Sequence, residues 1–118
     1  MESGSGKRAK ESGVRNRRYS IRFPLAADVE MLELESGTRV SGVTSDLSLG
    51  GCFVCARSKL EAGTRVRATL THEGQKAKVL AVVRMVKPHV GMGLEFLDMD
   101  PDSNATLLTW IENLRKPQ

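Results

Sequence analysis

Turn-forming residues divide the middle of this 118-residue chain into short apolar segments. Between Leu25 and Phe96, the turn signals are Ser36-Gly37, Glu61-Ala62-Gly63, Glu73-Gly74 and Lys87-Pro88. Short apolar runs bounded by glycine, proline and small polar residues are typical of β-strands joined by tight turns. We therefore predict an all-β domain in this region, either a small antiparallel barrel or a sandwich.

Two of these segments alternate apolar and polar residues with the period of a strand that buries one face. The sets predicted to face inward are Val66, Ala68 and Leu70 in one segment, and Val90, Met92, Leu94 and Phe96 in the other. Gly91 and Gly93 then fall on outward positions and leave a bare stripe where another group can pack closely. Between Met31 and Leu32 the alternation changes phase, which predicts a β-bulge at that point.

The segment after the last strand predicts a helix over residues 101–115. Asp100 is a suitable N-cap, Pro101 fits the first helical position, and Asp102 favours the positive end of the helix dipole. Four apolar residues follow at helical spacing: Leu107, Trp110, Ile111 and Leu114. We expect this apolar stripe to cover an open end of the barrel.

The positive charge of the chain is concentrated at its N-terminus. The net charge is +4, but residues 1–22 carry seven basic and two acidic side chains, and the remainder is close to neutral. We predict a disordered basic tail over 1–14 and a single domain over 15–118, in which a flexible arm (15–24) precedes the barrel (25–97). Such asymmetry indicates an anionic partner for the arm: a nucleotide, a nucleic acid or a membrane surface.

Several functional classes find no support in the sequence. The longest apolar run, Val79 to Val83, is far shorter than a membrane span, and the polar N-terminus does not resemble a signal peptide, so we expect a cytoplasmic protein without a membrane span. Cys52 and Cys55 have the spacing of a zinc pair, but no second pair accompanies them, and we expect both to be buried and structural. We predict no metal, no cofactor and no enzymatic activity, because no nucleophile or phosphate-loop motif is present.

Two short motifs carry residues that suit a guanine nucleotide. Arg18 and Arg22 offer planar charged forks that fit phosphates and the O6/N7 edge of guanine. The second motif, Asp46-Leu47-Ser48-Leu49-Gly50-Gly51, offers a carboxylate that can accept from guanine N1–H and N2–H₂ and a hydroxyl that can donate to a phosphate. Its two glycines, Gly50 and Gly51, permit positive φ and a close approach of the main chain to a ligand.

Strand alternation places the second motif on the outside of the barrel. In residues 40–49 it puts Val43, Leu47 and Leu49 on one face and Thr44, Asp46 and Ser48 on the other, outer face. A simpler interpretation stays open, in which Asp46, Ser48 and Gly51 form a β-turn held by a local side-chain hydrogen bond.

Together, Arg18-x-x-x-Arg22 and Asp46-x-Ser48-x-x-Gly51 resemble the paired signature of the PilZ domain, the bacterial receptor module for the second messenger cyclic di-GMP. The resemblance extends from Arg17 to Phe96. It implies a six-stranded antiparallel β-barrel, an N-terminal arginine arm that wraps the ligand, and a C-terminal helix.

The same resemblance implies roles for individual residues. Arg18 and Arg22 would bind phosphate and guanine, Asp46 and Ser48 would contact a guanine edge and its neighbouring phosphate, and Gly51 would hold the turn, with Gly50 beside it. Arg17 would add a third guanidinium group, which favours binding of a stacked pair of ligand molecules over a single one.

The expected function is therefore that of a cytoplasmic adaptor that binds cyclic di-GMP, orders its arm on the barrel and signals to an unidentified effector protein. The alternative is a nucleic-acid-binding barrel with a basic arm, although few outward aromatic side chains are available to stack on bases, and no specific nucleic acid is expected. A third possibility is an interaction module that needs no ligand.

Overall fold

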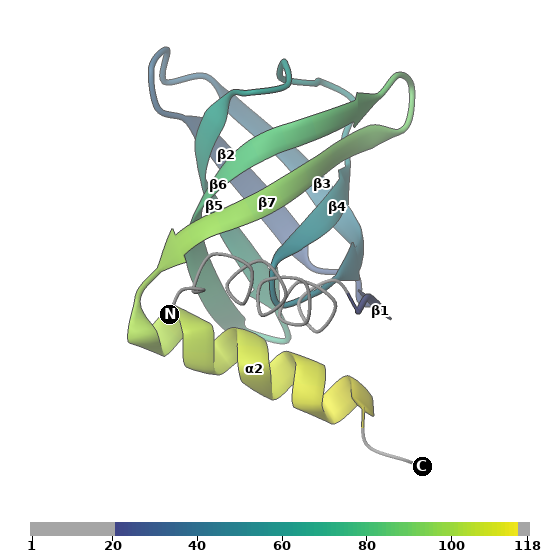
Figure 1. Ribbon diagram of the computed structural model, residues 1–118, viewed down its shortest axis with the longest axis vertical. Helices are drawn as coiled ribbons and strands as arrows, with labels where there is room; N and C mark the ends of the chain where they lie inside the picture. The colour runs from purple at the N-terminus through teal and green to yellow at the C-terminus, as the bar shows by residue number, and fades with distance from the viewer. Residues whose placement is uncertain (1–20, 116–118) are drawn as a thin grey trace, which may run out of the picture.

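The computed structural model describes residues 21–115, which form a closed antiparallel barrel with one helix packed across it (Figure 1). The strands are β1 (Phe23–Pro24), β2 (Asp28–Glu33), β3 (Arg39–Leu47), β4 (Gly51–Cys55), β5 (Arg65–His72), β6 (Gln75–Lys87) and β7 (Gly91–Met99), and the helix is α2 (Pro101–Arg115). The predicted tail (1–14) and most of the predicted arm lie outside the described residues.

Six strands close the barrel. Each of β2 to β7 pairs with two neighbours in the order β3-β2-β5-β6-β7-β4, and β4 returns to pair with β3. The short strand β1 is additional and pairs with the end of β3. This arrangement confirms the prediction of a six-stranded antiparallel β-barrel followed by a C-terminal helix.

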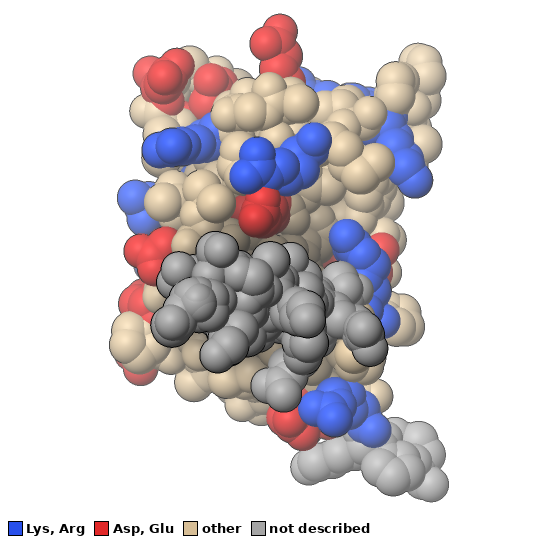
Figure 2. Space-filling view, viewed as in Figure 1, with Lys and Arg blue, Asp and Glu red and all other residues tan. Residues whose placement is uncertain are grey.

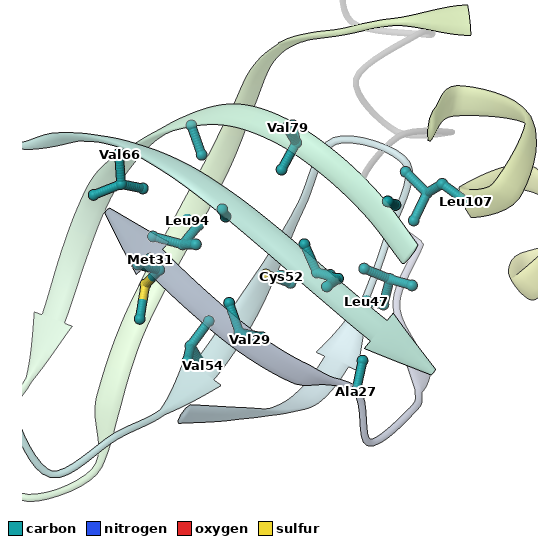
Figure 3. Packing of buried hydrophobic residues seen from close by; sticks show 14 of the residues in the cluster. Ala27, Val29, Met31, Leu47, Cys52, Val54, Val66, Val79, Leu94 and Leu107 are labelled. Carbon is teal, nitrogen blue, oxygen red and sulfur yellow. The ribbon is translucent and has the colours of Figure 1, made fainter. Parts of the chain in front are cut away.

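The barrel interior is filled by aliphatic side chains from all six strands. Val66, Ala68 and Leu70 are buried, as their alternation predicts. Figure 3 shows such side chains converging from several strands, with Leu107 of α2 at one end of the cluster. The barrel is therefore a packed core, so any ligand must bind on its outside or at its ends.

Helix α2 closes one end of the barrel, below the strands in Figure 1. Leu107, Trp110 and Ile111 are buried against the core, whereas Leu114 is 37% exposed and falls outside the contact that the apolar stripe predicts. The Trp110 indole N–H donates to the side-chain oxygen of Gln75 (3.2 Å), which holds the helix against the start of β6.

The N-terminus of α2 is capped as predicted. The Asp100 carboxylate accepts from the Ser103 backbone N–H (2.7 Å), and this bond, with the side chain of Ser103, lowers the pKa of Asp100. The Ser103 hydroxyl in turn accepts from the Lys78 backbone N–H (2.9 Å). The cap therefore also attaches the helix to β6.

The predicted bulge at Met31 and Leu32 is wrong. Both residues pair in continuous register with β3 on one side and β5 on the other, and Leu32 simply points outward and is half-buried. The register instead shifts in β3 between Thr44 and Asp46, in β6 between Val83 and Met85, and in β7 at Leu97, opposite Leu80 and Ala81.

The shift in β3 reverses the predicted faces of two residues. Ser45 has no partner in β4, because Thr44 pairs with Val54 and Asp46 pairs with Phe53. As a result, Val43 is 43% exposed and Thr44 is 3% exposed, the opposite of what regular alternation predicts.

The hairpin between β6 and β7 explains a further difference. Val90 is 50% exposed because it lies in the turn, one residue before β7 begins, and does not face inward as predicted. Within the described part of the chain, the helix is not long and apolar enough to cross a membrane.

Candidate functional site

Strand β1 brings the last arginine of the first motif to the second motif. Phe23 pairs with Leu47 and Pro24 pairs with Asp46, so the residue before β1 lies at the end of β3. There the Arg22 guanidinium forms an ion pair with the Asp46 carboxylate, although the two residues are 24 positions apart. Their side chains are 51% and 30% exposed, so both remain accessible from solvent.

Thr44 fixes the chain that follows β1. Its buried hydroxyl donates to the Leu25 carbonyl oxygen and accepts from the Ala27 backbone N–H (2.8 Å). The Thr44 backbone N–H also donates to the Ala27 carbonyl (2.9 Å). The inward position of Thr44, which the bulge at Ser45 creates, therefore holds the base of the arm against β3.

Ser48 lies inside the turn between β3 and β4. It is 3% exposed, and its hydroxyl accepts from the backbone N–H groups of Gly51 (3.1 Å) and Gly50 (3.2 Å) and donates to the Gly51 carbonyl (3.2 Å). The prediction that Ser48 shares an outer strand face with Asp46 is therefore wrong, because β3 ends at Leu47 and the chain turns there. For Ser48, the simpler interpretation as a turn residue describes its contacts.

Glycine is required at position 51 because there is no room for a side chain, and not because of its backbone angles. Neither Gly50 nor Gly51 is among the positive-φ glycines of the described residues, which are Gly37, Gly63 and Gly74. A Cβ atom on Gly51 would stand 2.2 Å from the Leu94 carbonyl oxygen. The turn is held further by the Phe96 backbone N–H, which donates to the Gly50 carbonyl (2.8 Å).

A groove of about 390 Å³ lies beside this turn. It is lined by Arg22 and by residues of the turn, Ser48, Gly50 and Gly51, and also by residues of β6 and β7: Arg84, Met85, Gly93, Leu94, Glu95 and Phe96. It therefore joins three of the predicted turn residues to one predicted arginine. Asp46 adjoins it through its ion pair with Arg22.

The β6 and β7 side of the groove was not predicted from the motifs. Arg84 and Glu95 form an ion pair there, and Met85 lies over Gly93, with its Cγ 2.9 Å from where a Gly93 Cβ would stand. The outward glycine at 93 was a sequence signal for this wall. The predicted bare stripe is in fact covered by Met85 and by the ring of Phe53.

A second hollow, of about 540 Å³, is larger but contains none of the motif residues. It is lined by residues around the β2–β3 turn and the start of β5, at the end of the barrel away from α2 (Figure 1). Size alone therefore does not identify the site, and the convergence of the two motifs favours the smaller groove.

Comparison with known proteins decides the family. The sequence matches the PilZ domain over residues 16–113. The chain belongs to the PilZ domain family. No curated protein sequence matches it.

Three solved structures, two of them of PilZ domains, share this fold. The PilZ domain of CeSA from a cellulose-synthesizing bacterium is 24% identical, with a TM-score of 0.62 over 82% of this chain and 100% of that one. The PilZ domain of YcgR from Escherichia coli, solved with c-di-GMP, is 17% identical, with a TM-score of 0.66 over 83% of this chain and 91% of that one. The Bacillus subtilis inhibitor of motility (MotI/DgrA) is 20% identical, with a TM-score of 0.62 over 81% of this chain and 52% of that one.

Two of the predicted site residues, Arg17 and Arg18, fall inside the PilZ match but outside the described residues. Their contacts stay predictions. Arg22, Asp46, Ser48, Gly50 and Gly51 all lie in or directly beside the groove.

The two cysteines of this PilZ domain differ in environment. Cys52 is fully buried, and burial together with the nearby Asp46 carboxylate raises its pKa to about 12, against an opposing effect of Arg22. Cys55 is exposed, so the prediction that both are buried is wrong for Cys55. Within residues 21–115, no three histidine, cysteine or acidic side chains are grouped as metal ligands would be.

Proposed function

We propose that this PilZ domain is a receptor for cyclic di-GMP and binds it in the groove beside the β3–β4 turn. The observation that carries the proposal is the pairing of β1 with β3, which places Arg22 against Asp46 at the edge of that groove. The YcgR domain, which was solved with c-di-GMP, supports the proposal through its shared fold.

The chemistry of the groove suits a guanine dinucleotide. The Arg22 guanidinium can bind a phosphate or the O6/N7 edge of guanine, and the Asp46 carboxylate can accept from N1–H and N2–H₂. In the free domain these two side chains bind each other. Because both are partly exposed to water, their ion pair is weak, and exchanging it for ligand contacts costs little.

Ser48 acts on the ligand through the turn. Its one donor hydrogen is engaged with the Gly51 carbonyl, so we assign it the shape of the turn and not a direct phosphate contact in the free domain. Gly50 and Gly51 present main chain without side chains beside the groove. Arg17 and Arg18 precede Arg22 by five and four residues, and we propose that their guanidinium groups bind the phosphates as well.

We propose that ligand binding changes the surface that the domain presents to other proteins. A cluster of arginines repels itself when free, and the phosphates of the ligand neutralise it, so the arm (15–24) orders on the barrel (25–97) when ligand binds. The altered surface then engages an effector protein. We propose this adaptor role, and no catalytic one, for the whole domain (15–118).

Isothermal titration calorimetry with cyclic di-GMP tests the proposal, with GTP and linear pGpG as controls. We expect saturable binding of the cyclic dinucleotide alone, and a stoichiometry of two ligands per chain if Arg17 supports a stacked pair. Saturation at one ligand would contradict the stacked pair only. Equal binding of all three compounds would contradict the receptor assignment.

Salt dependence separates this receptor from a nucleic-acid binder. Among the coloured residues on the face shown in Figure 2, Lys and Arg side chains are interspersed with Asp and Glu side chains. Affinity for a long polyanion should fall steeply with added salt, whereas a dinucleotide held in a groove releases fewer counterions. Tight, salt-sensitive binding of DNA or RNA would favour the alternative.

A further inference from the structure

The groove contains a second pairing of an arginine with a carboxylate, outside both sequence motifs. Arg84 of β6 donates through Nε to the Glu95 carboxylate of β7, and the two residues are 11 positions apart. Their side chains are 61% and 48% exposed, which is similar to the exposure of Arg22. Both residues line the groove, together with Arg22 and the β3–β4 turn.

A bulge in β6 explains why Arg84 is available there. Val83 pairs with Leu94 and Met85 pairs with Gly93, so Arg84 is the extra residue between two regular pairs. A bulge changes the direction of a side chain relative to the regular alternation of the strand. It allows Arg84 and its neighbour Met85 to line the same groove.

Glu95 is positioned by the turn of the second motif. It pairs with Gly51 across β4 and β7, and the Cα of Glu95 lies 3.5 Å from where a Gly51 Cβ would stand. Because Gly51 has no side chain, nothing from that position covers the outer face beside Glu95. The carboxylate is therefore next to the turn that we assign to ligand binding.

An apolar surface lies beside this second pair. The Met85 side chain, 45% exposed, lies over Gly93, two residues before Glu95 on the same face of β7. A methionine side chain is polarizable and adapts its shape, and it makes favourable contacts with aromatic rings. It offers a surface on which a planar base can rest while its edge reaches Glu95 or Arg84.

We propose that Arg84 and Glu95 recognise the second guanine of the cyclic dinucleotide, as Arg22 and Asp46 recognise the first. This inference rests on the proposed function. Cyclic di-GMP carries two identical bases, and two arginine–carboxylate pairs lie at the groove: Arg84 and Glu95 both line it, and Arg22 lines it beside its partner Asp46. At the second base, Glu95 accepts from N1–H and N2–H₂, and Arg84 donates to O6 and N7.

Adenine presents the opposite pattern to such a pair. It has an amino group at position 6, where guanine has an acceptor, and it lacks both N1–H and the 2-amino group. The groove should therefore discriminate against the hybrid cyclic GMP-AMP, in which one guanine is replaced by adenine.

The test is a comparison of both cyclic dinucleotides by calorimetry on wild type and Glu95→Gln. A glutamine side chain has the size of glutamate but pairs well with adenine, so Glu95→Gln should lower the preference for cyclic di-GMP over the hybrid by roughly tenfold or more. The ratio of the two affinities is the readout because both ligands carry the same two phosphates. Removing a negative charge changes both affinities alike and cancels in the ratio.

Two further variants separate the possible outcomes. Arg67→Gln changes an exposed arginine on β5, away from the groove, and should leave the ratio at its wild-type value. An unchanged ratio in Glu95→Gln, with wild type still binding cyclic di-GMP, would overturn the role of Glu95 alone. If wild type bound neither dinucleotide, the proposed function itself would fail.

Discussion

Gly51 lies against Leu94 so closely that a methyl group at position 51 would stand 2.2 Å from the Leu94 carbonyl oxygen. The contact is between main chains of β4 and β7, which pair at this point, so neither side can yield by changing a rotamer. The glycine that ends the second motif is thus required by the closure of the barrel, whatever the ligand requires of it.

Gly51→Ala should destabilise the fold. Because the new methyl group meets backbone, we expect the free energy of unfolding to fall by about 3 kcal/mol, as for severe overpacking. Urea denaturation measures this. Gly93→Ala is the matched control, since its methyl group meets the flexible side chain of Met85 at 2.9 Å and should cost about 1 kcal/mol or less. Equal losses in both variants would contradict the assignment to backbone contact.

Arg22→Ala should remove ligand binding and leave the fold intact. Its ion pair with Asp46 is partly exposed, so the loss in the free energy of unfolding should be about 1 kcal/mol or less. Calorimetry with cyclic di-GMP and urea denaturation on the same sample give both quantities. Arg67→Ala serves as the control for charge. A variant that binds as tightly as wild type would contradict the site.

Thr44→Val should loosen the base of the arm. The substitution keeps the shape of the side chain but leaves the buried Leu25 carbonyl and Ala27 N–H without the hydroxyl, at a cost of about 1–3 kcal/mol. We expect a lower urea midpoint, together with faster hydrogen exchange at Ala27. The control is Thr69→Val on β5, at a position that is only half-buried. A change no larger than that of the control would show that the hydroxyl is not needed.

The two thiols should react at very different rates. Exposed Cys55 should be modified by a thiol reagent in the folded protein, while Cys52, whose pKa is raised to about 12, should react only after unfolding. Mass spectrometry after brief labelling distinguishes one modification from two. Cys55→Ser should abolish the fast reaction. Fast labelling of Cys52 in the folded domain would contradict its burial.

The helix cap should contribute acid sensitivity. The pKa of Asp100 is lowered in the folded domain from 3.8, so its stabilising effect is complete above that value and is lost as the pH falls through the lower folded value. Asn also caps helices but does not titrate, so Asp100→Asn should lose less stability than wild type between neutral and acid pH. Thermal unfolding of wild type and Asp100→Asn, each at neutral and at acid pH, tests this. Parallel losses would argue against a role for the Asp100 charge.

The general architecture followed from the sequence because it depends on local patterns. Turn residues separated the strands, Asp100 and Pro101 marked the start of the helix, and the alternation at Val66, Ala68 and Leu70 gave the buried face of β5. Each of these features is decided within a few residues of the chain. The six-stranded closure came from the family resemblance and not from the pattern.

The pairing register of the strands could not be predicted from local patterns. The phase change at Met31 and Leu32 suggested a bulge, yet both neighbours of β2 pair with it regularly. The real bulge at Ser45 leaves no mark in the alternation, because it depends on how β4 pairs with β3. Because Ser45 was treated as part of a regular strand, Val43 and Thr44 were each assigned to the wrong face of β3.

For the candidate site, the motif residues were found but their geometry was not. Ser48 was expected to face solvent, and only the turn after Leu47 shows why its hydroxyl is engaged by Gly50 and Gly51. Arg84 and Glu95 belong to no motif. They reach the groove because β7 pairs with β4 on one side and with bulged β6 on the other, which is a property of the closed sheet.

The two residues of β1 also cover the end of β3, which would otherwise be an exposed strand edge. Strand β2 pairs with β3 only as far as Val43, and β1 takes over at Asp46 and Leu47. Without it, the end of β3 would present unpaired backbone groups, a template on which a second chain can add a strand. Deleting residues 1–24 would therefore expose this strand edge as well as remove the arginines, and the resulting aggregation could be mistaken for loss of signalling. Substituting single arginines avoids that confusion.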